Sequence, residues 1–141
     1  CPSGFIKMST QCFKIFLDRE RSWPEAKTKC EQEGYILAQP DDSVAVDLRK
    51  KLYEEYRTDW AWLGARGDGS KFVYAHGGLA LDNNSPLWFR GHPRNNVGAE
   101  RCLLLMVDGG YLSYFINQPT QQYWSMPCSS SMYNYALCEA K

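Results

Sequence analysis

The sequence predicts a small α+β domain, and three observations point to this fold class. Two segments in the first half have the period of amphipathic helices, whereas the second half has the pattern of strands. The 141 residues are 44% hydrophobic and 14% aromatic, which is enough for one hydrophobic core. We therefore expect a single domain over residues 1–141. The six cysteines, an even number, favour an oxidised framework of disulfides.

Two strands and a helix with recognisable ends are predicted first. The strands cover residues 5–8 and 12–17, where side chains alternate with period two. Ser22 can cap the helix, Glu25 stands at the capping-box position, and Gly34 suits its end. The apolar stripe of this helix is Trp23, Ala26 and Cys30.

A second helix is predicted to start at Asp42 or Ser43. One face of it is apolar, with Val44, Leu48 and Leu52. A run of charged side chains is placed outside, on a solvated face: Arg49, Lys50, Lys51, Glu54 and Glu55. This charge run therefore indicates no binding site.

The rest of the chain predicts strands and one long loop. The strands expected are 61–65, 71–74, 102–107, 111–115 and 133–139. Between Tyr74 and Cys102 lies a segment rich in glycine, asparagine and proline, with neither a helical nor a strand period. Loops longer than about 15 residues in a compact domain are usually functional. The long loop is therefore the place to look for a binding site.

Charge and cysteine usage limit the classes of partner and compartment. Lys and Arg number 16, as do Asp and Glu, so the zero net charge argues against nucleic acid and anionic membranes as partners. No apolar run reaches the ~20 residues that span a bilayer, so we expect no membrane insertion. No Cys-x-x-Cys clip favours a thiolate metal site.

These observations favour an extracellular location. An even cysteine count is typical of oxidising compartments, although composition leaves the pairing of six cysteines open. Asn83 begins the sequon Asn83-Asn84-Ser85 and is a candidate glycosylation site. We expect a mature secreted protein, or an ectodomain cut from a longer one.

Taken together, the two early helices, the β-rich second half and the long loop resemble the C-type lectin-like domain. The resemblance covers essentially the whole chain. Residues 61–64, Ala-Trp-Leu-Gly, are similar to the Trp-Ile-Gly-Leu core strand of that family. The spacing of Cys30, Cys102, Cys128 and Cys138 is similar to that of its four framework cysteines.

The resemblance implies a disulfide pairing and a more detailed fold. Cys1 and Cys12 resemble the extra amino-terminal pair of the long form of the family. The implied pairs are Cys1–Cys12, Cys30–Cys138 and Cys102–Cys128. The implied fold is α+β, with two helices on a lower antiparallel sheet and a small upper sheet carrying the long loop. The wording of 64–70 and 87–91 is closest to secreted invertebrate, particularly crustacean, members.

In that family a calcium ion bridges the protein to sugar hydroxyls, and the resemblance assigns positions to its ligands. A Glu-Pro-Asn or Gln-Pro-Asp triplet is replaced here by His92-Pro93-Arg94. The Asn-Asp pair falls on Trp124 and Ser125, and Glu100 alone matches its family position. Calcium prefers about six to eight oxygen ligands. We therefore expect no calcium-dependent sugar site and no cofactor, with Asn95 and Glu100 as weak candidates for an accessory calcium.

An arginine could take the place of the metal. The hypothesis is that Arg94, or else Arg101, neutralises Glu100 and holds the long loop without calcium, because a guanidinium supplies charge and geometry to a carboxylate. The alternative is an exposed and unpaired Glu100.

Basic and aromatic side chains are expected to form a binding rim around the long loop. Aromatic faces stack on sugar rings, and arginines bind sulfate, sialate or phosphate, so anionic glycans or lipopolysaccharide are candidate ligands. Trp124 is expected to be exposed, whereas Trp88 is expected to be a core residue at the root of the loop. The candidate ligand-binding residues are Arg90, His92, Arg94, Asn95, Glu100, Tyr123, Trp124 and Ser125.

The leading prediction is a secreted, lectin-like pattern-recognition module of innate immunity that binds glycans or microbial surface molecules without calcium. The first alternative is a protein-binding domain that does not bind sugars, and the second is a calcium-dependent lectin. The tripeptide Arg66-Gly67-Asp68 could be read by integrins, but it fits a turn between two strands. No nucleophile motif is present, so we expect no enzymatic activity.

Overall fold

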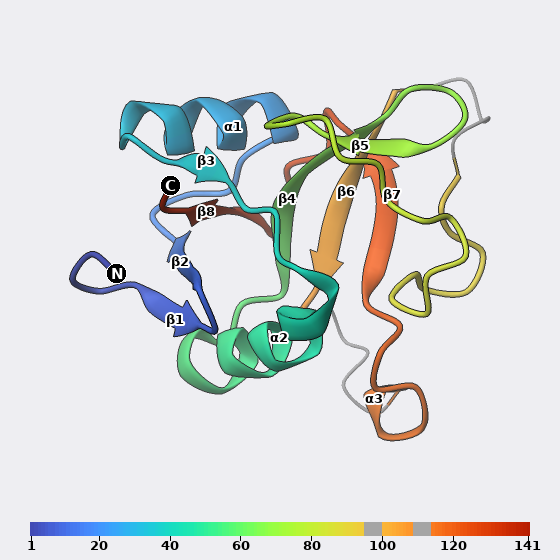
Figure 1. Ribbon diagram of the computed structural model, residues 1–141, viewed down its shortest axis with the longest axis horizontal. Helices are drawn as coiled ribbons and strands as arrows, with labels where there is room; N and C mark the ends of the chain where they lie inside the picture. The colour runs from blue at the N-terminus through green and yellow to red at the C-terminus, as the bar shows by residue number, and fades with distance from the viewer. Residues whose placement is uncertain (95–99, 109–113) are drawn as a thin grey trace.

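The computed structural model describes residues 1–94, 100–108 and 114–141, and it has the α+β class that the sequence predicts (Figure 1). The described helices are α1 (Trp23–Gln32), α2 (Asp42–Tyr56) and the short α3 (Tyr114–Asn117). The described strands are β1 (Ile6–Met8), β2 (Gln11–Phe16), β3 (Ile36–Leu37), β4 (Trp60–Gly67), β5 (Phe72–Tyr74), β6 (Arg101–Met106), β7 (Tyr123–Pro127) and β8 (Asn134–Glu139).

Helix α1 forms as its sequence predicts. The Ser22 hydroxyl accepts from the Glu25 backbone N–H at 3.5 Å, and the Glu25 carboxylate accepts from the Ser22 N–H at 2.9 Å. This reciprocal capping box satisfies two donors that the first turn leaves unpaired. The predicted stripe of Trp23, Ala26 and Cys30 is buried. The helix therefore packs by the face that its sequence assigned to the core.

One side chain of helix α2 lies elsewhere than predicted. Val44, Leu48 and Leu52 are buried as predicted, but Arg49, expected on the solvated face, is only 4% exposed. Its Nη1 donates to the Val107 carbonyl at 3.1 Å, and its guanidinium lies 3.9 Å from the centre of the Phe115 ring. The side chain is long enough to reach the chain beyond β6, where a carbonyl and an aromatic face accept its charge. Helix period alone does not reveal such a partner.

The strands form one connected mixed sheet of eight strands. The order is β1-β2-β8-β4-β6-β7, with β3 added to β8 and β5 added to β4. The neighbours β4 and β8 run parallel, whereas the other described pairs are antiparallel. The last strand is thus inserted between β2 and β4, where it joins the two ends of the sheet. The purely antiparallel lower sheet of the prediction becomes mixed for this reason.

Two strands were missed and one expected strand was misplaced. β3 has only two residues, and β7 ends in a proline and lacks a clear alternation. Of the expected strand over 111–115, residues 111–113 lie outside the described residues, and Tyr114–Asn117 is helical.

Disulfides and close packing join the layers. The structure contains the pairs that the resemblance implies: Cys1–Cys12, Cys30–Cys138 and Cys102–Cys128. Gly64 is required because a Cβ there would lie 2.6 Å from the Leu37 carbonyl oxygen. Because glycine has no side chain, β4 can pack closely against Leu37 and Ala38 at this position, which any other residue type would prevent.

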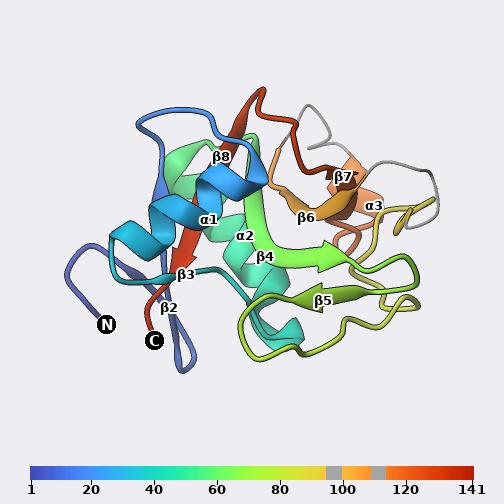
Figure 2. The ribbon, with the colours of Figure 1, turned by 90° about the horizontal axis from the view of Figure 1, so that it is seen from above.

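The long loop lies at the end of the molecule away from the termini. Both termini lie beside β1, β2 and β8, whereas β5, β6, β7 and the long loop form the opposite end (Figure 1 and Figure 2). Among the described helices, none combines the length and apolar character that a membrane crossing requires.

Candidate functional site

The root of the long loop is anchored in the core beside β7. Leu87 and Trp88 are buried, and the Trp88 indole donates to the Asp82 carbonyl at 3.0 Å. The Phe89 N–H donates to the Tyr123 carbonyl at 2.9 Å. The predicted core position of Trp88 at the root of the loop is confirmed. The anchor fixes where residues 89–94 leave the sheet.

Beyond this anchor, the loop is held to β7 through His92, Arg94 and Ser125. The Ser125 N–H donates to His92 Nδ1 at 3.0 Å, so Nδ1 is the acceptor and the ring proton lies on Nε2. The Arg94 N–H donates to the Ser125 hydroxyl oxygen at 2.7 Å. The Ser125 hydroxyl lies 2.9 Å from His92 Nδ1 and can direct its own proton there. We call these three residues the loop latch.

The His92 imidazole is neutral in the loop latch. Burial, together with the charges of Arg94 and Arg101, lowers its pKa to about 4. The expectation that His92 adds positive charge to a binding rim is therefore wrong at neutral pH. Its role in the structure is that of a hydrogen-bond acceptor for β7.

The loop latch joins two positions that the resemblance assigns to calcium ligands. His92 stands in the triplet position and Ser125 in the Asn-Asp position, and a direct contact connects them. Imidazole, indole and a single hydroxyl are a poor donor set for calcium, which prefers several carboxylate and carbonyl oxygens. In the part of the chain that the structure describes, no cluster of three or more His, Cys, Asp or Glu is placed to hold a metal. Asn95 lies outside the described residues.

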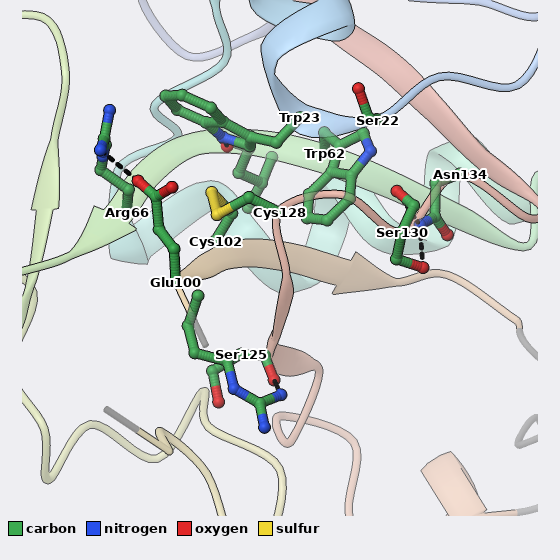
Figure 3. Close-up of a disulfide and its surroundings, with 12 residues drawn as sticks. Ser22, Trp23, Trp62, Arg66, Glu100, Cys102, Ser125, Cys128, Ser130 and Asn134 are labelled. Carbon is green, nitrogen blue, oxygen red and sulfur yellow. Dashed lines mark hydrogen bonds and ion pairs between the residues drawn. A yellow bond between two sulfur atoms is a disulfide. The ribbon is translucent and has the colours of Figure 1, made fainter. Parts of the chain in front are cut away.

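Glu100 pairs with neither Arg94 nor Arg101, the two partners expected. It forms an ion pair with Arg66 of β4, as Figure 3 shows. Arg94 Nε instead donates to the Gly91 carbonyl at 3.3 Å, and Arg101 Nη1 donates to the Ser125 carbonyl at 3.2 Å. The predicted neutralisation by Arg94 or Arg101 is wrong, and so is the unpaired alternative.

The strand register explains this ion pair. Arg66 stands opposite Cys102 in the β4–β6 pair, so its side chain lies within reach of Glu100. Both side chains are about half exposed, and such a pair contributes at most about 1 kcal/mol. Asp68 accepts from the N–H groups of Ser70 and Lys71, at 3.0 and 2.9 Å. Both charged members of the Arg-Gly-Asp tripeptide are therefore engaged locally, which argues against the integrin reading.

The aromatic part of the expected rim is packed rather than open. Tyr123 and Ser125 are fully buried, so neither can contact a ligand at the surface as predicted. Trp124 is half-buried: Phe89 stacks on its ring with centroids 4.5 Å apart, and the His92 ring lies 4.7 Å away. Trp60 meets it edge-on at 5.2 Å. The expected exposure of Trp124 is wrong because the root of the loop folds back over β7.

The structure therefore leaves a smaller surface than the sequence suggested. Of the predicted ligand-binding residues, Arg90, Arg94 and Glu100 are exposed, and Glu100 is paired with Arg66. We call Arg90 and Arg94 the basic rim. Sequence reasoning missed Arg66 as the partner of Glu100, because the register of β4 against β6 brings the two side chains together.

No family model matches the chain, but individual relatives and structures do. C-type lectin lectoxin-Lio3 of Erythrolamprus poecilogyrus is 29% identical over 119 residues, or 81% of this chain and 71% of that protein. Ladderlectin of Oncorhynchus mykiss is 26% identical, over 74% of this chain and 55% of its own length. The C-type lectin CEL-I from Cucumaria echinata superimposes with a TM-score of 0.75 at 13% identity, covering 99% of this chain and 96% of that one.

The chain has a C-type lectin-like fold. Human lithostathine agrees, with a TM-score of 0.74 at 18% identity over 100% of this chain and 99% of its own. Relatives and structural neighbours of the chain are C-type lectins, a non-enzymatic family. The narrower likeness to crustacean members stays a prediction.

Removing the Ser125 hydroxyl of the lectin-like domain is expected to lower the free energy of unfolding by about 1–2 kcal/mol. Ser125→Ala leaves the Arg94 N–H without its acceptor and removes one of two contacts to His92 Nδ1. Denaturant unfolding measures the loss. Ser129→Ala serves as the control, because Ser129 is exposed and lies outside the strands and the loop latch. No loss of stability is expected for this variant. Equal stability of the two variants would contradict the loop latch.

Proposed function

We propose that this lectin-like domain is a secreted recognition module of innate immunity. It would bind glycans or microbial surface ligands without a calcium bridge. The observation that carries the proposal is the loop latch. It joins the loop to β7 at two positions where the family uses metal ligands. SPL-1, a structural neighbour, is described in complex with GlcNAc, which supports sugar binding on this fold. The disulfides support an oxidising, extracellular compartment.

Anionic groups on the ligand are favoured by the charges at the loop. The basic rim, Arg90 and Arg94, is exposed, whereas residues 87–94 and 123–128 contain no carboxylate. Arginine binds sulfate, phosphate and carboxylate through paired hydrogen bonds. Sulfated or sialylated glycans and lipopolysaccharide are therefore the ligand classes proposed for this surface. Weak single-site binding would gain strength from multivalent presentation.

Glycan-array binding and thermal melting with and without EDTA test the proposal together. We expect the same glycan signal under both conditions, together with an unchanged melting temperature, since a bound ion would stabilise the folded state. Signal only with added calcium would overturn the calcium-independent mode. Absence of signal in both conditions would overturn sugar binding.

Charge reversal identifies the surface in the same assay. Arg90→Glu and Arg94→Glu should each weaken binding to a sulfated glycan, because each replaces attraction with repulsion. Lys50→Glu is the matched control: Lys50 is exposed on α2, outside the loop. Equal losses in all three variants would show that only overall charge matters, and would remove the basic rim from the site.

A protein ligand is the second candidate function, and the packed aromatic cluster favours it. Phe89 and His92 cover the Trp124 ring, so stacking on a sugar would require them to move. A protein partner could instead contact the outer surface of this cluster and the basic rim. If the domain bound no glycan on the array and kept its stability in EDTA, this candidate would be favoured. Asn83 stays a proposed glycosylation site, and its side chain is exposed.

A further inference from the structure

A second concave surface lies between the start of α2 and the long loop. It is a cleft of about 530 Å³, and its lining includes residues 39–42, at the start of α2, and residues 79–82, from the long loop. Its floor includes Tyr74, Trp88 and Tyr123. This volume is within the range of small-molecule sites in proteins. None of the loop-latch or basic-rim residues lines it, so the cleft is separate from the surface proposed above. We propose that this cleft binds a small organic ammonium ion.

One wall of the cleft is held rigidly by a buried carboxylate. Glu139 at the end of β8 is 2% exposed and accepts from the Gln39 N–H at 2.9 Å and from Gln11 Nε2 at 3.0 Å. Gln11 Oε1 in turn accepts from the Asp41 N–H at 2.9 Å. The Gln39 side chain also bonds both the N–H and the carbonyl of His76. A wall fixed in this way loses little entropy when a ligand binds.

The charges of the cleft favour a cation. Asp41, Asp42 and Asp82 all line it, and no ion pair within the described ranges engages their carboxylates. Lys141 is the basic side chain of the lining. Its ammonium lies 3.6 Å from the Glu139 carboxylate, which balances its positive charge. The first two carboxylates also suit the amino-terminal end of α2. Asp82 comes from the long loop, so carboxylates from two separate segments contribute to the negative potential of the cleft.

The same cleft offers an apolar surface and a buried polar group. Leu79, in the wall, is 70% exposed, which is a large apolar area to leave in water. The hydroxyl of Tyr123 is fully buried beside that of Tyr74. No hydrogen bond of ordinary geometry joins the Tyr123 hydroxyl to any described residue. A ligand N–H could donate to the phenolic oxygen of Tyr74, which also lines the cleft, while its apolar body covers Leu79.

These features together define the ligand class: a protonated amine on an apolar or aromatic body. The carboxylates attract the ammonium group, the Tyr74 phenolic oxygen accepts one of its protons, and Leu79 packs against the body. A neutral molecule of the same shape would lack the first contribution, and an anion would be repelled.

Titration of the ¹⁵N-labelled domain with three matched probes tests the proposal. Tryptamine should give saturable chemical-shift changes in residues 79–82 and in the Trp88 indole, and these should weaken with added salt. The neutral indole-3-ethanol and the anionic indole-3-acetate should bind at least tenfold more weakly. No saturable change with tryptamine, or equal binding of the alcohol, would overturn the proposal.

Charge-neutral variants test the assignment of the carboxylates. Asp42→Asn and Asp82→Asn should each weaken tryptamine binding about fivefold, the loss expected for one nearby surface charge. Asp47→Asn is the control, because Asp47 is exposed on α2 and does not line the cleft. An equal loss in the control would mean that the amine responds only to overall charge, and the cleft would be rejected as its site.

Discussion

Replacing both Cys30 and Cys138 by alanine is expected to lower the free energy of unfolding by about 4–5 kcal/mol. Their disulfide joins residues 108 positions apart, and closing so long a loop restricts the unfolded chain strongly. Both cysteines are fully buried, and the bond ties α1 to β8 at the centre of the fold. Alanine avoids placing an unpaired hydroxyl in this core. Reversible unfolding in denaturant measures the loss.

The amino-terminal disulfide provides the matched control. Cys1 and Cys12 are 11 positions apart, so the same reasoning gives only about 2–3 kcal/mol for the double alanine variant. The long-range pair should therefore cost about 2 kcal/mol more. Equal losses would contradict the dependence on loop length and would indicate that packing around the cysteines dominates.

Truncating Trp62 to alanine is expected to cost about 4 kcal/mol, the second-largest effect. The side chain is fully buried between α1 and the sheet, so its loss removes apolar burial and leaves a cavity. Its indole N–H also donates to the Arg21 carbonyl at 2.8 Å, which would lose this donor. Chemical denaturation followed by far-UV circular dichroism measures the change.

A conservative variant separates the two contributions at Trp62. Trp62→Phe keeps most of the aromatic volume but removes the donor to Arg21, so about half of the alanine loss is expected. If phenylalanine were as damaging as alanine, the hydrogen bond and not the cavity would control stability at this position.

The helices could be predicted from the sequence because their determinants are local. The Ser22–Glu25 capping box and the stripe of Trp23, Ala26 and Cys30 lie within one short segment, and the structure shows both. Arg49 was misplaced because its burial depends on Val107, 58 positions away. Strand β7 was missed because its pairing with β6, rather than its own alternation, creates it.

The candidate site was located more accurately than its chemistry was described. His92 and Ser125 were singled out through the family positions, but their contact to each other depends on how the loop folds over β7. The Arg66–Glu100 pair depends on the register of β4 against β6, which no local pattern gives. Trp124 and Tyr123 looked accessible because sequence does not show what covers a side chain.

The cleft could not be seen in the sequence at all. Its walls come from segments far apart in the chain, and the Gln11–Glu139 contact that supports one wall spans 128 positions. Its carboxylates look like ordinary helix-start and turn residues when each is considered alone. Only the assembled fold brings them to face the same space.

The position of the termini has a practical consequence for measuring such interactions. Because both ends of the chain lie opposite the long loop, a tag at either end can fix the domain to a sensor surface with the loop pointing outward. Immobilisation by the amino end or by the carboxyl end should therefore give the same response to a soluble glycan. The same geometry lets copies be displayed on a bead or particle, where weak single contacts add up to avidity.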